Sequence, residues 1–107
     1  MTTSIRAAGT TRIVDVNGEI DLANSASMRR ILFESLQGTD RLAVNLAATK
    51  YVDSSGIATL IEVLKEARRV GKEFVLFALS NAARDVFRLT HVNKVFRYEN
   101  ESEALRP

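Results

Sequence analysis

Several residue types that define common classes of protein are missing or rare in this chain. Its 107 residues include no cysteine, no tryptophan, one proline and one histidine. The lack of cysteine excludes disulfides, thiolate metal sites and thiol catalysis. His91 lies outside any HExxH pattern, so we expect no metal site and predict that His91 occupies a turn or the surface.

Charge of one sign and long apolar runs are also scarce. The 15 Lys and Arg residues nearly balance 13 Asp and Glu residues, and the basic residues are scattered, so we expect no direct contact with nucleic acid. No apolar stretch approaches the roughly 20 residues that cross a bilayer, which predicts no membrane segment. The first residues lack the pattern of a signal peptide, and a cytoplasmic location fits best.

The length of the chain limits its organisation. A chain of 107 residues can bury one contiguous core but has no room for a cofactor domain beside a substrate domain. We therefore expect residues 1–107 to form a single domain.

Hydrophobic periodicity predicts an alternation of strands and helices. A turn at residues 9–11 predicts a hairpin that ends near Ile20, and apolar runs predict further strands at 41–46, 74–78 and 95–98. Residues 47–52 lead from the first of these runs into Asp53. Apolar residues at helical spacing predict three helices, at residues 25–37, 57–70 and 81–89. Residues 100–105 in the tail could add a helical turn. This order predicts an α/β fold, with a mixed central sheet, an antiparallel hairpin edge and flanking helices.

The segment Asp53-Ser54-Ser55-Gly56, hereafter the motif, places an acid and two hydroxyls at the entry to the clearest helix. Asp and Ser are favoured N-caps because their oxygens accept hydrogen bonds from first-turn N–H groups. The same helix end has free N–H groups and a dipole that favour an anion, such as a phosphate on Ser55. From the residues alone, capping and anion binding both remain open.

Two kinds of chemistry are not supported. The five glycines form neither a dinucleotide fingerprint nor a Walker A loop, so no nucleotide cofactor is expected. A nucleophile-elbow hydrolase needs Gly-x-Ser-x-Gly and a histidine base, and residues 52–56 do not fit that pattern. We therefore do not expect an enzyme.

Two segments resemble the anti-sigma-factor antagonists of the STAS family. Residues 53–60, Asp-Ser-Ser-Gly-Ile-Ala-Thr-Leu, resemble the signature of the family, and residues 18–21 resemble its Gly-Glu-hydrophobic-Asp segment. The later elements follow the order of the family, so the resemblance covers nearly the whole chain. The chain departs from the family at Ala58 and at residues 90–92, where the family often has glycine.

The resemblance implies a STAS-like fold and a phosphorylation switch. Ser55 would be phosphorylated by a partner serine kinase with a histidine-kinase-like ATPase fold, which doubles as the anti-sigma factor. A serine phosphatase of the PP2C type would remove the phosphate. The unphosphorylated chain would bind the kinase and release the sigma factor.

The resemblance also implies a contact surface for this partner. It comprises Asp21, Asp53, Ser54, Gly56 and Ile57. Each of these residues has a structural alternative, because Asp21 could end a strand, Ser54 could cap, Gly56 could permit close packing and Ile57 could be core. Two other functions remain open: a small-ligand or anion sensor on the same fold, and a regulator in a partner-switching pathway without a sigma factor.

Overall fold

The chain begins with a β-hairpin at one edge of the sheet. In the computed structural model, which describes residues 1–92 and 94–104 apart from the side chains of residues 101 and 102, β1 (Thr2–Ala8) pairs antiparallel with β2 (Thr11–Ile20). Gly9 in the turn has a φ of 61°, a left-handed conformation that glycine adopts without a steric penalty. The predicted hairpin and its antiparallel edge are confirmed.

The long strand β2 has two parallel partners on its other side. β3 (Arg41–Asn45) pairs with residues 11–15, and β4 (Thr49–Val52) pairs with residues 18–20 across a bulge. The separate strand β4 differs from the expectation that residues 47–52 simply lead into the motif. Its two central residues are exposed, so this short segment lacks the apolar run that marked the other strands.

Parallel pairing continues across the sheet from β3. β5 (Glu73–Phe77) pairs with β3, and β6 (Arg97–Glu99) pairs with β5, which gives the order β1-β2-β3-β5-β6. The final strand starts two residues later than predicted. The reason is local, because the Val95 N–H donates to the Val92 carbonyl in a turn.

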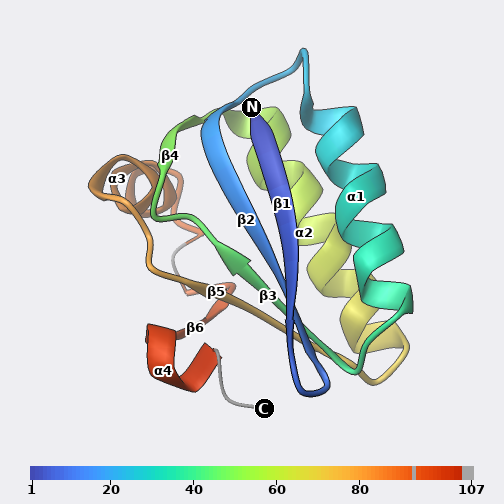
Figure 1. Cartoon of the computed structure of the whole chain (residues 1–107). Coiled ribbons are helices and arrows are strands. Elements are labelled where there is room, and N and C mark those ends of the chain that lie inside the picture. Colours follow the sequence, from blue (N-terminus) through green and yellow to red (C-terminus); the bar gives the residue numbers. More distant parts are fainter. Residues whose placement is uncertain (93, 105–107) are drawn as a thin grey trace.

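The helices occupy the sides of the sheet (Figure 1). α1 (Ser25–Gln37) and α2 (Ser54–Arg69) pack together on one face, α3 (Asn81–Leu89) lies against β4, and α4 (Glu101–Ala104) contacts β5. The mixed α/β fold is confirmed. No helix in the described part of the chain is both long enough and apolar enough to span a bilayer.

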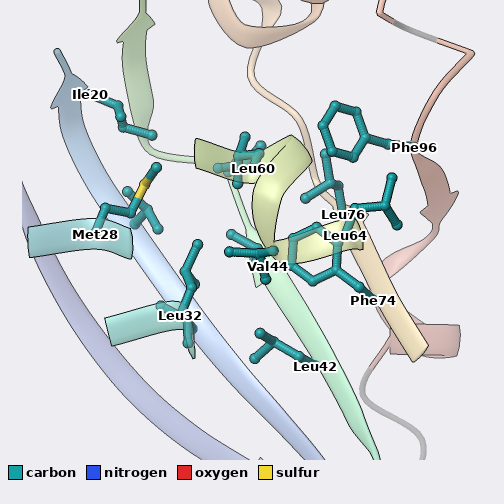
Figure 2. Packing of buried hydrophobic residues seen from close by; sticks show 14 of the residues in the cluster. Ile20, Met28, Leu32, Leu42, Val44, Leu60, Leu64, Phe74, Leu76 and Phe96 are labelled. Atoms are coloured by element: carbon teal, nitrogen blue, oxygen red, sulfur yellow. The ribbon is translucent and has the colours of Figure 1, made fainter. Parts of the chain in front are cut away.

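The main core lies between the sheet and the layer formed by α1 and α2 (Figure 2). Side chains from α1, the strands and α2 interlock there, and Phe96 stacks on Phe87 of α3 at 5.6 Å between ring centroids. A smaller cluster on the opposite face contains Ala104 of α4. This packing fixes the ends of β2 and β4, where the motif begins.

The buried side chain of Arg41 connects the C-terminal elements to the start of β3. Arg41 at the start of β3 is 6% exposed; it donates to Glu99 of β6 and to the carbonyl of Ala104. It also donates to Glu73 of β5 at 3.1 Å. The side chain of Glu99 is only 3% exposed, so both members of this pair are removed from water.

Candidate functional site

The motif lies at the carboxyl ends of β2 and β4. Asp53 follows β4 directly, and its N–H donates to the carbonyl of Ile20 at the end of β2, at 3.0 Å. α2 begins at the next residue. Residues 21–24, which connect β2 to α1, lie at the same end of the molecule (Figure 1). The fold thus brings together two segments that are about thirty residues apart.

Asp53 is the N-cap of α2. One carboxylate oxygen, Oδ1, accepts hydrogen bonds from the N–H groups of Ser55 at 2.9 Å and Gly56 at 3.1 Å. The same oxygen accepts the hydroxyl hydrogen of Ser55, with 2.5 Å between the oxygens. The Ser55 hydroxyl and these N–H groups lower the pKa of Asp53 below its ordinary 3.8, so the side chain is an anion near neutral pH. The capping interpretation is confirmed for Asp53, whereas Ser54 is the first residue of the helix and not its cap.

This cap changes the expectation of free N–H groups at the helix end. The amides of Ser55 and Gly56 are already bonded to Asp53. An added anion at this helix end would therefore compete with a carboxylate for the same donors. Like-charge repulsion between the two is strongest within a few ångströms.

The two serines of the motif differ in their surroundings. Ser54, the first residue of α2, is exposed, whereas Ser55 is half-buried and its hydroxyl donates to Asp53. The carbonyl of Ser55 accepts the Thr59 hydroxyl one turn later. His91 lies exposed in the turn after α3 with a φ of 61°, as predicted, in a segment where the resemblance leads one to expect glycine.

Gly56 and Ile57 are buried beneath the surface of the motif. A Cβ atom on Gly56 would lie 2.6 Å from Cγ2 of Ile20 and 2.9 Å from Cγ1 of Val52. Ile57 is 5% exposed and belongs to the main core. Packing alone accounts for both residue types, and their contact with a partner stays a prediction.

The turn before α1 is held by its own hydrogen bonds. The carbonyl of Asp21 accepts from the N–H groups of Asn24 and Ser25, and its carboxylate accepts from the N–H of Ala23. The side chain of Asn24 accepts from the Asp21 N–H and donates to the carbonyl of Glu19, so Asn24 caps this turn instead of α1. Asp21 therefore shapes a turn as well as ending β2.

Leu22, which the sequence interpretation did not single out, links this turn to the motif. Its N–H donates to the second carboxylate oxygen of Asp53, Oδ2, at 3.2 Å. Its side chain is 79% exposed. The signal in the sequence that could have identified it is an apolar side chain in the short connection before the helix predicted at residues 25–37.

The described residues offer limited alternatives for binding. They contain no group of three or more His, Asp or Glu side chains arranged for a metal ion. A cavity of about 550 Å³ lies away from the motif, and its lining includes Leu79, Arg84, Phe87, Tyr98 and Glu99. Burial raises the pKa of Tyr98 there.

Comparison with known proteins agrees with this geometry. Residues 3–104 match the STAS domain family profile. The chain is 30% identical over 92 residues to the anti-sigma-B factor antagonist of Staphylococcus aureus, which covers 85% of each protein.

Solved structures share the fold along nearly the whole chain. An anti-sigma factor antagonist from Mycobacterium paratuberculosis has a TM-score of 0.85 and 24% identity, covering 97% of this chain and 90% of that one. The Bacillus cell fate determinant SpoIIAA in its phosphorylated form has a TM-score of 0.73 and 19% identity, covering 97% and 96%.

Proposed function

The chain belongs to the STAS domain family, and we propose that it is an anti-sigma-factor antagonist whose state is set by phosphorylation of Ser55. In this proposal, the unphosphorylated chain binds a serine kinase with a histidine-kinase-like ATPase fold, which is also the anti-sigma factor. That binding releases the sigma factor. A serine phosphatase of the PP2C type returns the chain to its binding state.

The observation that carries this proposal is the placement of the Ser55 hydroxyl. It lies at the surface end of α2, whose following residues are anchored in the core. The hydroxyl is thus presented on a rigid element next to the exposed Ser54 and the half-buried Asp53. The curated relative named an anti-sigma-B factor antagonist supports the same function.

Phosphorylation would act through local charge. A phosphate adds about 1.5 to 2 negative charges, here beside the Asp53 carboxylate. The core residues of α2 lie deeper, so the domain keeps its fold when it is modified. A phosphorylated SpoIIAA structure that matches this chain along nearly its whole length supports that expectation.

The larger effect would fall on the partner interface. Burying a phosphate beside Asp53, with no additional cation on the partner to pair with it, costs several kcal/mol, and about 1.4 kcal/mol corresponds to a tenfold loss of affinity. We place Asp21, Asp53, Ser54, Gly56 and Ile57 in or directly beneath this interface. Phosphorylation then releases the kinase, which is free to bind the sigma factor again.

The first test is a phosphorylation assay. The purified chain is mixed with ATP and each serine kinase of this fold encoded in its own genome, and the intact mass and modified residue are determined. We expect one phosphate on Ser55, none on Ser55→Ala, and an unchanged result for Ser54→Ala. Phosphate on Ser54 alone would show that the acceptor is the wrong serine. No phosphate with any kinase would contradict the switch and favour the ligand-sensor interpretation.

The second test compares affinities for the kinase. We expect Ser55→Ala to bind permanently and Ser55→Asp to bind at least about tenfold more weakly, because only the latter places a charge at the interface. Isothermal titration with purified kinase measures both. Equal affinities would contradict an electrostatic release.

A further inference from the structure

We propose that Leu22 is the apolar anchor with which this chain engages its kinase partner, and that Asp53 couples this anchor to the state of Ser55. The inference rests on the proposed function and names the residue whose position, and with it the affinity for the partner, would change on phosphorylation. It follows from an exposed side chain, the hydrogen bonds that hold its turn and one shared carboxylate.

The side chain of Leu22 is almost fully exposed to solvent. At 79%, its exposure exceeds that of the other large apolar residues in the described part of the chain, of which Leu89 at 74% comes next. Exposing a leucine forgoes the free energy that its burial would contribute. The fold nevertheless fixes Leu22 at the surface, immediately beside the motif.

The turn that carries Leu22 is closed by its own hydrogen bonds before any partner arrives. Hydrogen bonds of 2.9–3.1 Å close it through Asp21 and Asn24, and the Leu22 N–H is itself bonded to Asp53. An apolar side chain on a backbone that is already held loses less freedom on binding than one on an unheld loop, which favours its use as an anchor.

Charge around Leu22 indicates the chemistry of the complementary surface. The half-buried carboxylates of Asp21 and Asp53 accept hydrogen bonds from the N–H groups of Ala23 and Leu22, respectively. A partner that fits this arrangement has an apolar pocket for the leucine side chain and a rim that carries cations or N–H donors. Opposite charges on the two rims would also orient the complex.

Phosphorylation would uncouple the anchor because the new phosphate displaces the Asp53 carboxylate, which the loss of the hydroxyl hydrogen alone, as in Ser55→Ala, does not do. Transfer of the γ-phosphoryl group from ATP forms an O–P bond at Ser55 Oγ and breaks the bond between the γ-phosphorus and the β,γ-bridging oxygen. The hydroxyl proton goes to solvent and ADP leaves. The ester oxygen can only accept, so Asp53 Oδ1 loses the hydrogen that it received across 2.5 Å. The phosphate also repels the carboxylate and competes for the amides of Ser55 and Gly56. Asp53 therefore turns away, and its Oδ2 releases the N–H of Leu22.

The anchor is tested with two matched leucine variants. Leu22→Ala and Leu89→Ala each shorten a highly exposed leucine, one beside the motif and one on α3. With the kinase that phosphorylates Ser55, we expect Leu22→Ala to bind at least tenfold more weakly and Leu89→Ala to stay within twofold of the wild type. Both variants should unfold at the wild-type temperature.

The outcomes separate this inference from the proposed function. If the wild type binds the kinase and Leu22→Ala binds within twofold of it, the anchor is wrong and the switch stands. If the wild type neither binds the kinase nor is phosphorylated by it, both the anchor and the proposed switch are wrong.

The coupling is tested by NMR on the free protein, without the kinase bound. We expect phosphorylation of Ser55, and separately Asp53→Asn, to move the Leu22 amide proton upfield and to speed its exchange with water at least tenfold. The Leu89 amide is the internal reference. An unchanged Leu22 amide in the phosphorylated protein would overturn the coupling, whatever the affinity of Leu22→Ala.

Discussion

Arg41 and Asp53 are two charged residues that form hydrogen bonds with distant parts of the chain. They lie at opposite ends of β2. Arg41 lies beside Thr11 at the start of this strand, and Asp53 bonds to Ile20 at its end. Arg41 is almost fully buried and contacts other buried groups, whereas Asp53 is half-buried and contacts an exposed turn and a hydroxyl.

The difference shows how burial decides what a charged residue does. Removing a buried charge leaves its partner in a medium that cannot solvate it, so the effect falls on stability. Removing a charge at the surface lets water replace the lost contacts, so the effect falls on the shape and charge of the surface. Arg41 thus holds the fold together, and Asp53 organises the surface that we propose a partner reads.

The largest effect is expected at the buried end. Arg41→Met leaves the buried side chain of Glu99 with the exposed Arg97 as its remaining cation, and we expect the free energy of unfolding to fall by about 3–5 kcal/mol. Urea unfolding followed by circular dichroism measures it. Arg88→Met is the matched control, because its pair with Asp85 is exposed and contributes at most about 1 kcal/mol. Similar losses in the two variants would mean that burial does not separate the two kinds of ion pair.

An intermediate effect is expected beneath the motif. In Gly56→Ala the new methyl group meets the branched side chains of Ile20 and Val52, and we expect a loss of about 1–3 kcal/mol in thermal or urea unfolding. Gly38→Ala is the control, since the atoms nearest to its methyl group belong to the guanidinium end of Arg12, a flexible side chain that can move. A Gly56→Ala protein as stable as the wild type would show that the packing under the motif is loose.

The smallest effect on stability is expected at Asp53, and it depends on pH. Its pKa is lower in the folded chain than its ordinary 3.8, so its contribution to stability is present above that value and is lost as the pH falls through the folded pKa. The wild type should therefore exceed Asp53→Asn in stability near neutral pH, and the difference should shrink below pH 3.8. Parallel unfolding curves across the acid range measure this.

The hydroxyl of Ser55 is the largest cause of the lowered pKa of Asp53. In Ser55→Ala, the pKa of Asp53 should therefore rise toward its ordinary value. NMR titration of the side-chain carboxyl carbon measures it. An unchanged titration would argue against a hydrogen bond between Ser55 and Asp53 in solution.

Local patterns allowed most of the fold and part of the site to be predicted. The hairpin, the three longer helices and the cap at Asp53 are set by neighbouring residues, and the structure confirms them. Strand β4 could not be found this way, because four residues with an exposed middle owe their conformation to pairing with β2. The exposed position of Leu22 was not predicted for the same reason, since its N–H donates to a residue 31 positions away.

The sequence by itself determined the class of fold, the order of the elements and the motif with its acid and two hydroxyls. These depend on periodicity and capping, which act over a few residues. Only the tertiary structure decided that Asp53 occupies the helix-end amides and holds Leu22, and that Arg41 is buried against Glu99. Those contacts join segments that come together only when the sheet assembles, and no local preference encodes which distant partner a charged side chain meets.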